Sequence, residues 1–131
     1  MTIREGYSAQ LHDKVITEAV KILDQERFDI YTNPNQEKNA SINDNYPDII
    51  LTEKGTTTVK FIIEVETSDS INQNEAENQW KKYATEINCT FYLLVPTNSL
   101  NKANELCKIL GINVRFARYT ETAENINIKF D

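Results

Sequence analysis

Two apolar segments that carry acids at their ends do most to limit how this chain can fold. In the first, Asp48 opens the run Ile49–Leu51, and in the second, Glu64 and Glu66 close a run that starts at Phe61. Side chains two residues apart on a strand point the same way, so Glu64 and Glu66 are expected to share one face of a sheet. Because carboxylates removed from water need a partner, three such acids on neighbouring strands predict a bound cation.

The composition is that of a folded domain. Hydrophobic residues make up 40% of the 131 residues and charged residues 26%, which is typical of globular chains and predicts a single domain over residues 1–131. The first residues lack the apolar stretch of a signal peptide, and no run approaches the roughly 20 apolar residues of a membrane span, so we expect a cytoplasmic protein without a membrane partner. Cys89 and Cys107 lack C-x-x-C spacing and are expected to be reduced core residues.

The charge distribution bears on nucleic-acid binding. The net charge of −6 weighs against simple duplex binding, which usually uses a basic surface. Between residues 79 and 119, however, basic residues outnumber the acids Glu86 and Glu105; they are Lys81, Lys82, Lys102, Lys108, Arg115 and Arg118. A bound metal would also offset part of the acidic charge. The alternative is that these residues form only a solvated surface.

The first half of the chain reads as one helix and three strands. Apolar residues at helical spacing predict a helix over residues 7–26, and a short strand follows at 28–31. Residues 32–46 are polar and rich in asparagine, which indicates a loop long enough to be functional or mobile. Strands are expected at 48–52 and 58–67; the turn at 53–55 has the composition of a hairpin, so these two strands should be antiparallel.

The second half alternates helices and strands. Apolar residues at helical spacing, from Ala76 to Ile87, predict a helix, and the continuous apolar run 90–95 predicts a strand covered on both faces. A third helix is expected between the N-cap Ser99 and the stop signal Gly111, followed by a strand at 112–117 and a weak final strand at 126–130. An α/β fold with a mixed sheet flanked by helices satisfies this order.

Three sequence motifs occur in a recognisable order. Pro47-Asp48 begins one strand, Glu64-Val-Glu66 ends the next, and Gln79-Trp-Lys-Lys-Tyr83 lies on the following helix. In these motifs and in the order of its elements the chain resembles the PD-(D/E)xK nuclease superfamily, the third motif being similar to the Q-x-x-x-Y signature of its exonuclease-like branch. The resemblance implies a restriction-endonuclease-like α-β-β-β-α-β core, to which a C-terminal α-β unit is added here.

The resemblance also implies a function and a set of site residues. It implies a nuclease, endo- or exodeoxyribonuclease, that uses Mg²⁺ or Mn²⁺ to hydrolyse phosphodiester bonds in nucleic acid, with DNA as the expected partner. Asp48 and Glu64 would ligate the metal, Glu66 would be a further ligand or the general base, and Gln79 would hold phosphate or the substrate backbone. Members of the superfamily often add an acid from the first helix, and Glu18, at the border of its apolar stripe, is the candidate.

One residue departs from the family pattern. Glu66 stands where the motif usually has a lysine, which would orient the attacking water and stabilise charge on the phosphate. Some restriction enzymes of the superfamily use glutamate at this position. A lysine from elsewhere could substitute, and Lys82 is the better candidate, because it lies about 60° around the helix from Gln79 whereas Lys81 lies about 160° away.

Other interpretations of the same residues stay open. The acids could form a water-exposed cluster at a sheet edge, and Tyr83 could simply pack while Gln79 is solvated. His12 lies toward the apolar side of the first helix, where a lone histidine is more often structural than catalytic. At the level of function, the alternatives are a catalytically inactive nuclease-fold binding or assembly protein and a small acidic inhibitor-type partner. A domain of this size could also act as a homodimer or beside a larger protein.

Overall fold

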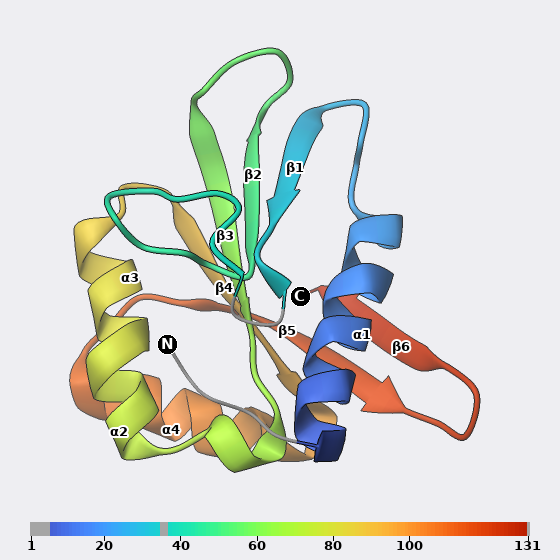
Figure 1. The fold of residues 1–131 in the computed structure, drawn as a ribbon. Helices are drawn as coiled ribbons and strands as arrows, with labels where there is room; N and C mark the ends of the chain where they lie inside the picture. The colour runs from blue at the N-terminus through green and yellow to red at the C-terminus, as the bar shows by residue number, and fades with distance from the viewer. Residues whose placement is uncertain (1–5, 35–36, 131) are drawn as a thin grey trace.

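The structure is a computed structural model that describes residues 6–34 and 37–130. A six-stranded mixed sheet, in the order β1-β2-β3-β4-β5-β6, runs through it, and helices cover both of its faces (Figure 1). The elements are α1 (Gly6–Ile22), β1 (Phe28–Thr32), β2 (Ile49–Glu53), β3 (Val59–Val65), η2 (Ser68–Ser70), α2 (Gln73–Glu75), η3 (Ala76–Trp80), α3 (Lys81–Glu86), β4 (Thr90–Pro96), η4 (Thr97–Ser99), α4 (Leu100–Leu110), β5 (Arg115–Glu121) and β6 (Ile126–Phe130). The predicted α/β class, with a mixed sheet flanked by helices, is confirmed.

The connections between strands explain how they pair. β1, β2 and β3 form an antiparallel meander, and the tight turn between β2 and β3 contains Gly55 at a φ of 77°. β4 is parallel to β3 and β5 is parallel to β4, because the helical segments α2 to α3 and α4 carry the chain back across the sheet. β6 closes the sheet antiparallel to β5. The expected antiparallel hairpin and the expected final strand are both confirmed.

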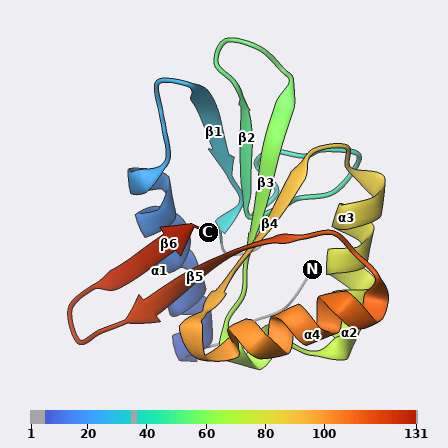
Figure 2. The same ribbon diagram turned by 180° about the vertical axis from the view of Figure 1, so that it is seen from behind.

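Two hydrophobic cores lie on the two faces of the sheet. α1 packs on one face, beside β3 and β6, through Val15, Ile16 and Ala19. The segment from α2 to α3, together with α4, packs on the other face, where Trp80 is fully buried. Seen from behind, α4 lies next to α2, and β5 and β6 curl away from the first three strands (Figure 2). β4 is covered on both faces, as its continuous apolar run predicts.

The second helical segment contains an irregular turn. α2, η3 and α3 follow one another without a break from residue 73 to residue 86, and η3 is a π-helical turn. The segment begins at Asn72, whose side chain accepts a hydrogen bond from the Glu75 N–H at 2.9 Å. Turns of this kind are rare in proteins, and those that occur are often at functional sites. Here the turn carries Gln79 and Trp80, which bear on the candidate site.

Several predicted boundaries are wrong, among them the end of the strand expected at 112–117, which runs to Glu121, and the end of β3, at Val65 and not at 67. Two of the shifts have a local reason. α1 ends at Ile22 and not near residue 26, because the Asp24 carboxylate accepts hydrogen bonds from the N–H groups of Glu26 and Arg27 and so forms a turn. β5 begins at Arg115 and not at 112, because the Ile112 N–H still bonds a carbonyl of α4 in the helix cap. Element ends depend on such side-chain and cap interactions, which apolar periodicity does not report.

Two further sequence expectations concern cysteines and membranes. Both cysteines are free thiols; Cys107 is buried and Cys89 is half-buried, as predicted. Burial raises the pKa of each thiol to about 11, so both are expected to remain protonated near neutral pH. None of the described helices combines the length and the apolar character that a transmembrane segment needs.

The helix stop at Gly111 generates the first testable prediction. Gly111 has a φ of 65°, and an added Cβ would meet no heavy atom within 4 Å. Gly111→Ala should therefore destabilise the protein through backbone strain alone, by about 1 kcal/mol, and Gly111→Asn by less, because asparagine tolerates this conformation. Urea unfolding measures both. Equal stability of the glycine and alanine proteins would contradict the assigned conformation.

Candidate functional site

The centre of the candidate site is a reciprocal pair of hydrogen bonds between the start of β2 and the end of β3. The Asp48 backbone N–H donates to Glu64 Oε1 at 2.8 Å, and the Val65 N–H donates to Asp48 Oδ2 at 2.8 Å. Each carboxylate is thus held by the neighbouring strand's backbone. Charge-assisted bonds of this kind are among the stronger hydrogen bonds in proteins. We call Asp48 and Glu64 the acid pair.

The acid pair is buried but incompletely satisfied. Asp48 is 8% exposed and Glu64 5%. Among the described residues, the second oxygens, Asp48 Oδ1 and Glu64 Oε2, accept no hydrogen bond. Burial, followed by the negative charges of Asp48 and Glu66, raises the pKa of Glu64 well above its ordinary value, although the Asp48 N–H acts in the opposite direction. A proton or a cation is therefore needed to relieve this site.

His12 is the residue of α1 that reaches the acid pair. Its Nε2 lies 3.0 Å from Asp48 Oδ2, and its Nδ1 lies 3.2 Å from Asp13 Oδ1. Both ring nitrogens can donate to these carboxylates only when the ring is protonated; the neutral ring can donate to one of them. The imidazole is buried, so its contact with Asp48 Oδ2 lies inside the protein.

Glu66 is placed differently from the acid pair. It is 0% exposed; Trp80 Nε1 donates to its Oε1 at 3.1 Å and Ser70 Oγ donates to its Oε2 at 2.5 Å. The Tyr119 hydroxyl donates to its backbone carbonyl at 2.8 Å. Glu66 and Glu64 both raise the pKa of Tyr83 through their negative charge. Glu66 thereby joins the end of β3 to η2, η3 and β5.

Glu18 lies apart from these acids. Its Oε1 is 3.2 Å from Lys21 Nζ, its side chain is partly exposed, and the pair is of the ordinary i,i+3 type on the surface of α1. Exposed pairs of this type contribute little to stability. The contact from α1 to the acid pair is made by His12, six residues earlier in the sequence.

Gln79, Lys82 and Tyr83 lie together on the wall of a pocket of about 250 Å³. This pocket, which we call the lysine pocket, is lined by Lys38, Asp44, Asn45, Tyr46, Asn78, Gln79, Lys82 and Tyr83. Burial, followed by the charges of Glu64 and Asp48, strongly raises the pKa of Tyr83. Tyr83 is therefore close enough to the acid pair to be affected by its charge, and it shares the pocket lining with Gln79 and Lys82.

The loop before β2 forms the opposite wall of the lysine pocket. Asn33 organises it: its side-chain amide donates to the carbonyls of Ala40 and Pro47, and its oxygen accepts from the N–H groups of Asn39 and Ala40. The loop then passes beside α3 (Figure 1), where the Asn43 side chain donates to the Glu86 carbonyl at 3.1 Å. Asparagine-rich composition indicated a loop but not this packed conformation.

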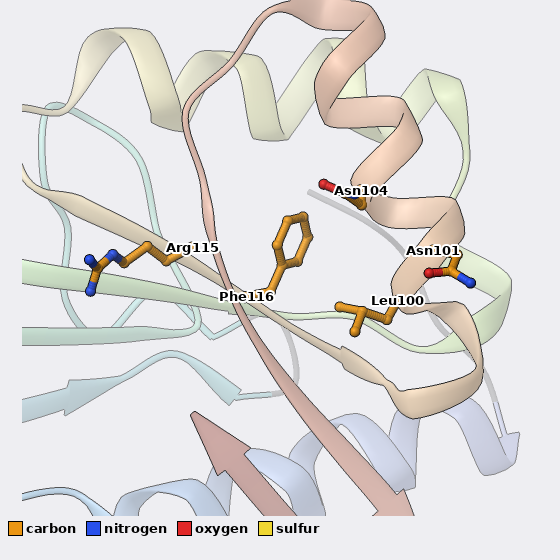
Figure 3. Close-up of a pocket in the computed structure, with 5 residues that line it drawn as sticks. All are labelled: Leu100, Asn101, Asn104, Arg115 and Phe116. Atoms are coloured by element: carbon orange, nitrogen blue, oxygen red, sulfur yellow. The ribbon is translucent and has the colours of Figure 1, made fainter. Parts of the chain in front are cut away.

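Two other pockets contain none of the sequence-predicted site residues. One of about 490 Å³ lies between α4 and β5 and is lined by Leu100, Asn101, Asn104, Arg115 and Phe116; the Arg115 side chain points away from Phe116 (Figure 3). Another of about 660 Å³ lies at the hairpin end of the sheet, near Lys60 and Phe61. Neither of these two pockets has a buried acid in its lining.

The donor set of the acid pair fits a hard divalent cation in part. Among residues 6–34 and 37–130, no three His, Cys, Asp or Glu side chains form a complete metal-binding group. Mg²⁺ does not require one, since it commonly binds through one or two carboxylates and completes its octahedron with water and substrate phosphate. Asp48 Oδ1 and Glu64 Oε2 supply two such oxygens. Glu66, whose oxygens both accept from buried donors, fits a positioning role better than a ligand role.

The sequence alone did not reveal the part that three residues play in this site: His12, Asn33 and Trp80. His12 was seen on the apolar side of its helix, and its partner Asp48 is 36 residues away in the chain. A polar residue on an apolar face, together with acids at strand ends that need partners, is the signal that could have joined them. Trp80 read as a core residue, and its indole N–H, which needs an acceptor when buried, was the corresponding clue.

The raised pKa of Glu64 predicts a pH-dependent effect of one substitution. In the metal-free wild type, protonated Glu64 stabilises the folded state at pH values below its ordinary pKa of 4.5. This stabilisation is lost as the pH rises through the raised pKa that Glu64 has in the folded state. Glu64→Gln cannot ionise and keeps the acceptor for the Asp48 N–H. In EDTA, the melting temperature of the variant should therefore exceed that of the wild type by several degrees near neutral pH, with the difference vanishing in acid.

Glu18→Gln is the matched control for this comparison, because Glu18 is a partly exposed acid paired with Lys21. Its melting temperature should follow that of the wild type at every pH. A Glu64→Gln protein that is less stable than the wild type near neutral pH would show that the acid pair carries no unrelieved charge.

Comparison with protein-family models, with curated proteins and with solved structures gives no match for this chain. Its function is therefore inferred from the geometry of the acid pair and its surroundings.

Proposed function

We propose that this protein is a magnesium-dependent nuclease that hydrolyses phosphodiester bonds in DNA. The observation that carries the proposal is the acid pair: two buried carboxylates from adjacent strands, each held by the other strand's backbone and each with one oxygen left for a cation. Two neighbouring carboxylates that are buried away from water require compensation of their charge, and Mg²⁺ is the common cation for two carboxylates beside a phosphate.

The order of elements supports a restriction-endonuclease-like core as part of this proposal. From α1 through β4 the chain runs helix, three strands, helix and strand, with β1 to β3 antiparallel and β4 parallel to β3. Asp48 lies immediately before β2 and Glu64 near the end of β3, the positions that the nuclease resemblance implies for the two metal-binding acids. The C-terminal α4–β5–β6 unit extends the sheet beyond that core.

In the proposed site each residue has a role that follows from its contacts. Asp48 and Glu64 would hold Mg²⁺, or Mn²⁺, and the metal would supply polarisation of the phosphoryl oxygen and a lowered pKa of water. His12 and the Val65 N–H fix the orientation of Asp48. Glu66 holds η3 through the Trp80 indole, so it positions the residues that follow on the same helical segment. These interactions preorganise the acid pair before substrate arrives.

The family lysine is replaced in this proposal by cations outside β3. Lys82 lines the lysine pocket beside Gln79 and Tyr83, and Lys38 enters the same pocket from the loop. Both ammonium groups are exposed and can neutralise charge on a phosphate next to the acid pair. Glu66 remains a candidate for the general base only if the site opens, because its oxygens accept from Trp80 and Ser70 in the closed interior.

A nuclease-fold binding protein without turnover is the second candidate, favoured by Glu66. The acid stands in the place of the motif lysine and is used for internal hydrogen bonds. An acidic inhibitor finds less support, because that role leaves the burial of the three acids unexplained. Metal binding and cleavage distinguish the first two candidates.

Mg²⁺ should stabilise the wild type through the acid pair. A cation at ten times its dissociation constant, binding only the folded state, stabilises by about 1.4 kcal/mol, and for a domain of this size we expect a rise of about 4 °C in melting temperature. Differential scanning fluorimetry with Mg²⁺, and with Mn²⁺, measures the rise. Asp48→Asn and Glu64→Gln should lose it and Glu18→Gln should keep it. An equal rise in melting temperature in all four proteins would show that the metal does not bind at the acid pair.

Cleavage should depend on the same two residues. With Mn²⁺ or Mg²⁺, the wild type is expected to cleave at least one of single-stranded, duplex and branched DNA, with RNA as a further test. Loss of a group that stabilises charge in the transition state typically costs a factor of about 10² to 10³ in rate, so Asp48→Asn and Glu64→Gln should be inactive on gels that detect the wild type. Activity of Asp48→Asn at the wild-type rate would identify a contaminating nuclease, and no cleavage by any protein would favour the binding candidate.

A further inference from the structure

The lysine pocket is a polar hollow, and the metal chemistry proposed above uses only its two lysines. One wall comes from the loop before β2 and includes Lys38, Asn45 and Tyr46; the other comes from η3 and α3 and includes Gln79 and Lys82. The Asn43 bond to the Glu86 carbonyl holds the two walls together. The pocket is therefore built by two segments that are far apart in the sequence.

The lining of the pocket is suited to an anion. Lys38 and Lys82 contribute one ammonium group from each wall, and side-chain amides of Asn45, Asn78 and Gln79 add further donors. Asp44 is the single acid in the lining, and it is exposed. In a chain with a net charge of −6, a hollow with two cations and one acid is a local reversal of the overall sign.

The position of the pocket ties it to the acid pair. Tyr46 precedes Asp48 by two residues, and the Tyr83 hydroxyl lies within the electrostatic influence of Glu64 and Asp48. Lys38 Nζ lies 5.4 Å from the centre of the Tyr46 ring, so the ammonium group is held at the mouth of the pocket by a cation–π contact. The pocket and the acid pair are thus joined by the short segment that contains Tyr46 and Asp48.

The size of the pocket restricts what can enter. The pocket holds about 250 Å³, so it is a small hollow that can take one unit of a polymer at a time. An extended single strand can place such a unit in it. Proteins that bind single-stranded nucleic acid commonly place aromatic side chains beside basic ones, and Tyr46 and Lys38 provide that combination.

We propose that the lysine pocket binds one nucleotide of a single-stranded nucleic acid, with Lys38 and Lys82 contacting the phosphate adjacent to the phosphodiester at the acid pair. This inference deepens the proposed nuclease function and rests on it for the identity of the polymer. The expected substrate class is therefore nucleic acid whose strands are unpaired, or frayed at an end.

Binding of a short fluorescein-labelled oligothymidylate, followed by fluorescence anisotropy in EDTA, tests the pocket without turnover. Each phosphate contact on a single strand contributes about 0.7 to the slope of log K against log salt. Lys38→Ala and Lys82→Ala should therefore each reduce the slope by about 0.7 and weaken binding about fivefold at about 0.1 M salt. Lys60→Ala, which removes an exposed lysine from the pocket at the hairpin end of the sheet, should leave the affinity within error of the wild type.

The outcomes separate this inference from the nuclease proposal. Unchanged affinity in the Lys38→Ala and Lys82→Ala proteins, or a duplex of equal length that binds as tightly as the single strand, overturns the pocket assignment even when DNA is cleaved. Lysine-dependent binding of the single strand supports the assignment even when no DNA is cleaved, in which case the nuclease proposal alone fails.

Discussion

The exchange of hydrogen bonds between Asp48 and the end of β3 is the interaction on which the rest of the site depends. Two backbone N–H groups, one just before β2 and one at the end of β3, are used to hold two carboxylates. Because N–H groups on adjacent strands are placed by the sheet itself, the carboxylates need no further side chain to fix one oxygen each. The pairing of the two strands thereby fixes the distance between the two carboxylates.

Around this exchange, polar contacts connect elements that the hydrophobic cores pack separately. His12 brings α1 to Asp48 from one face, and Glu66 brings η3 and β5 to the end of β3 on the other. These bonds are buried, where each is stronger than in water and where loss of one partner leaves a costly unsatisfied group. A site assembled in this way is rigid before any ligand arrives, which suits a role in positioning a metal and a phosphate.

The sequence was a good guide to what periodicity and turn chemistry determine. The apolar runs at 48–52 and 58–67 predicted two paired strands, and residue alternation placed Glu64 and Glu66 on one side. It was a poor guide to which long side chains meet. Glu18 and His12 both lie near the border of the apolar stripe of α1, and only the tertiary position of Asp48 decides between them. Likewise, alternation gives the face of Glu66 but not the Trp80 and Ser70 donors that fill it.

The bond from the Tyr119 hydroxyl to the Glu66 carbonyl gives the last third of the chain a part in the site. Tyr119 lies on β5, in the unit that follows β4, and its side chain is buried. That unit thus supports the chain segment that turns from β3 into the helices. Sequence changes in β5 near Tyr119 would accordingly be constrained by the segment that holds Glu66, to which β5 contributes this hydroxyl.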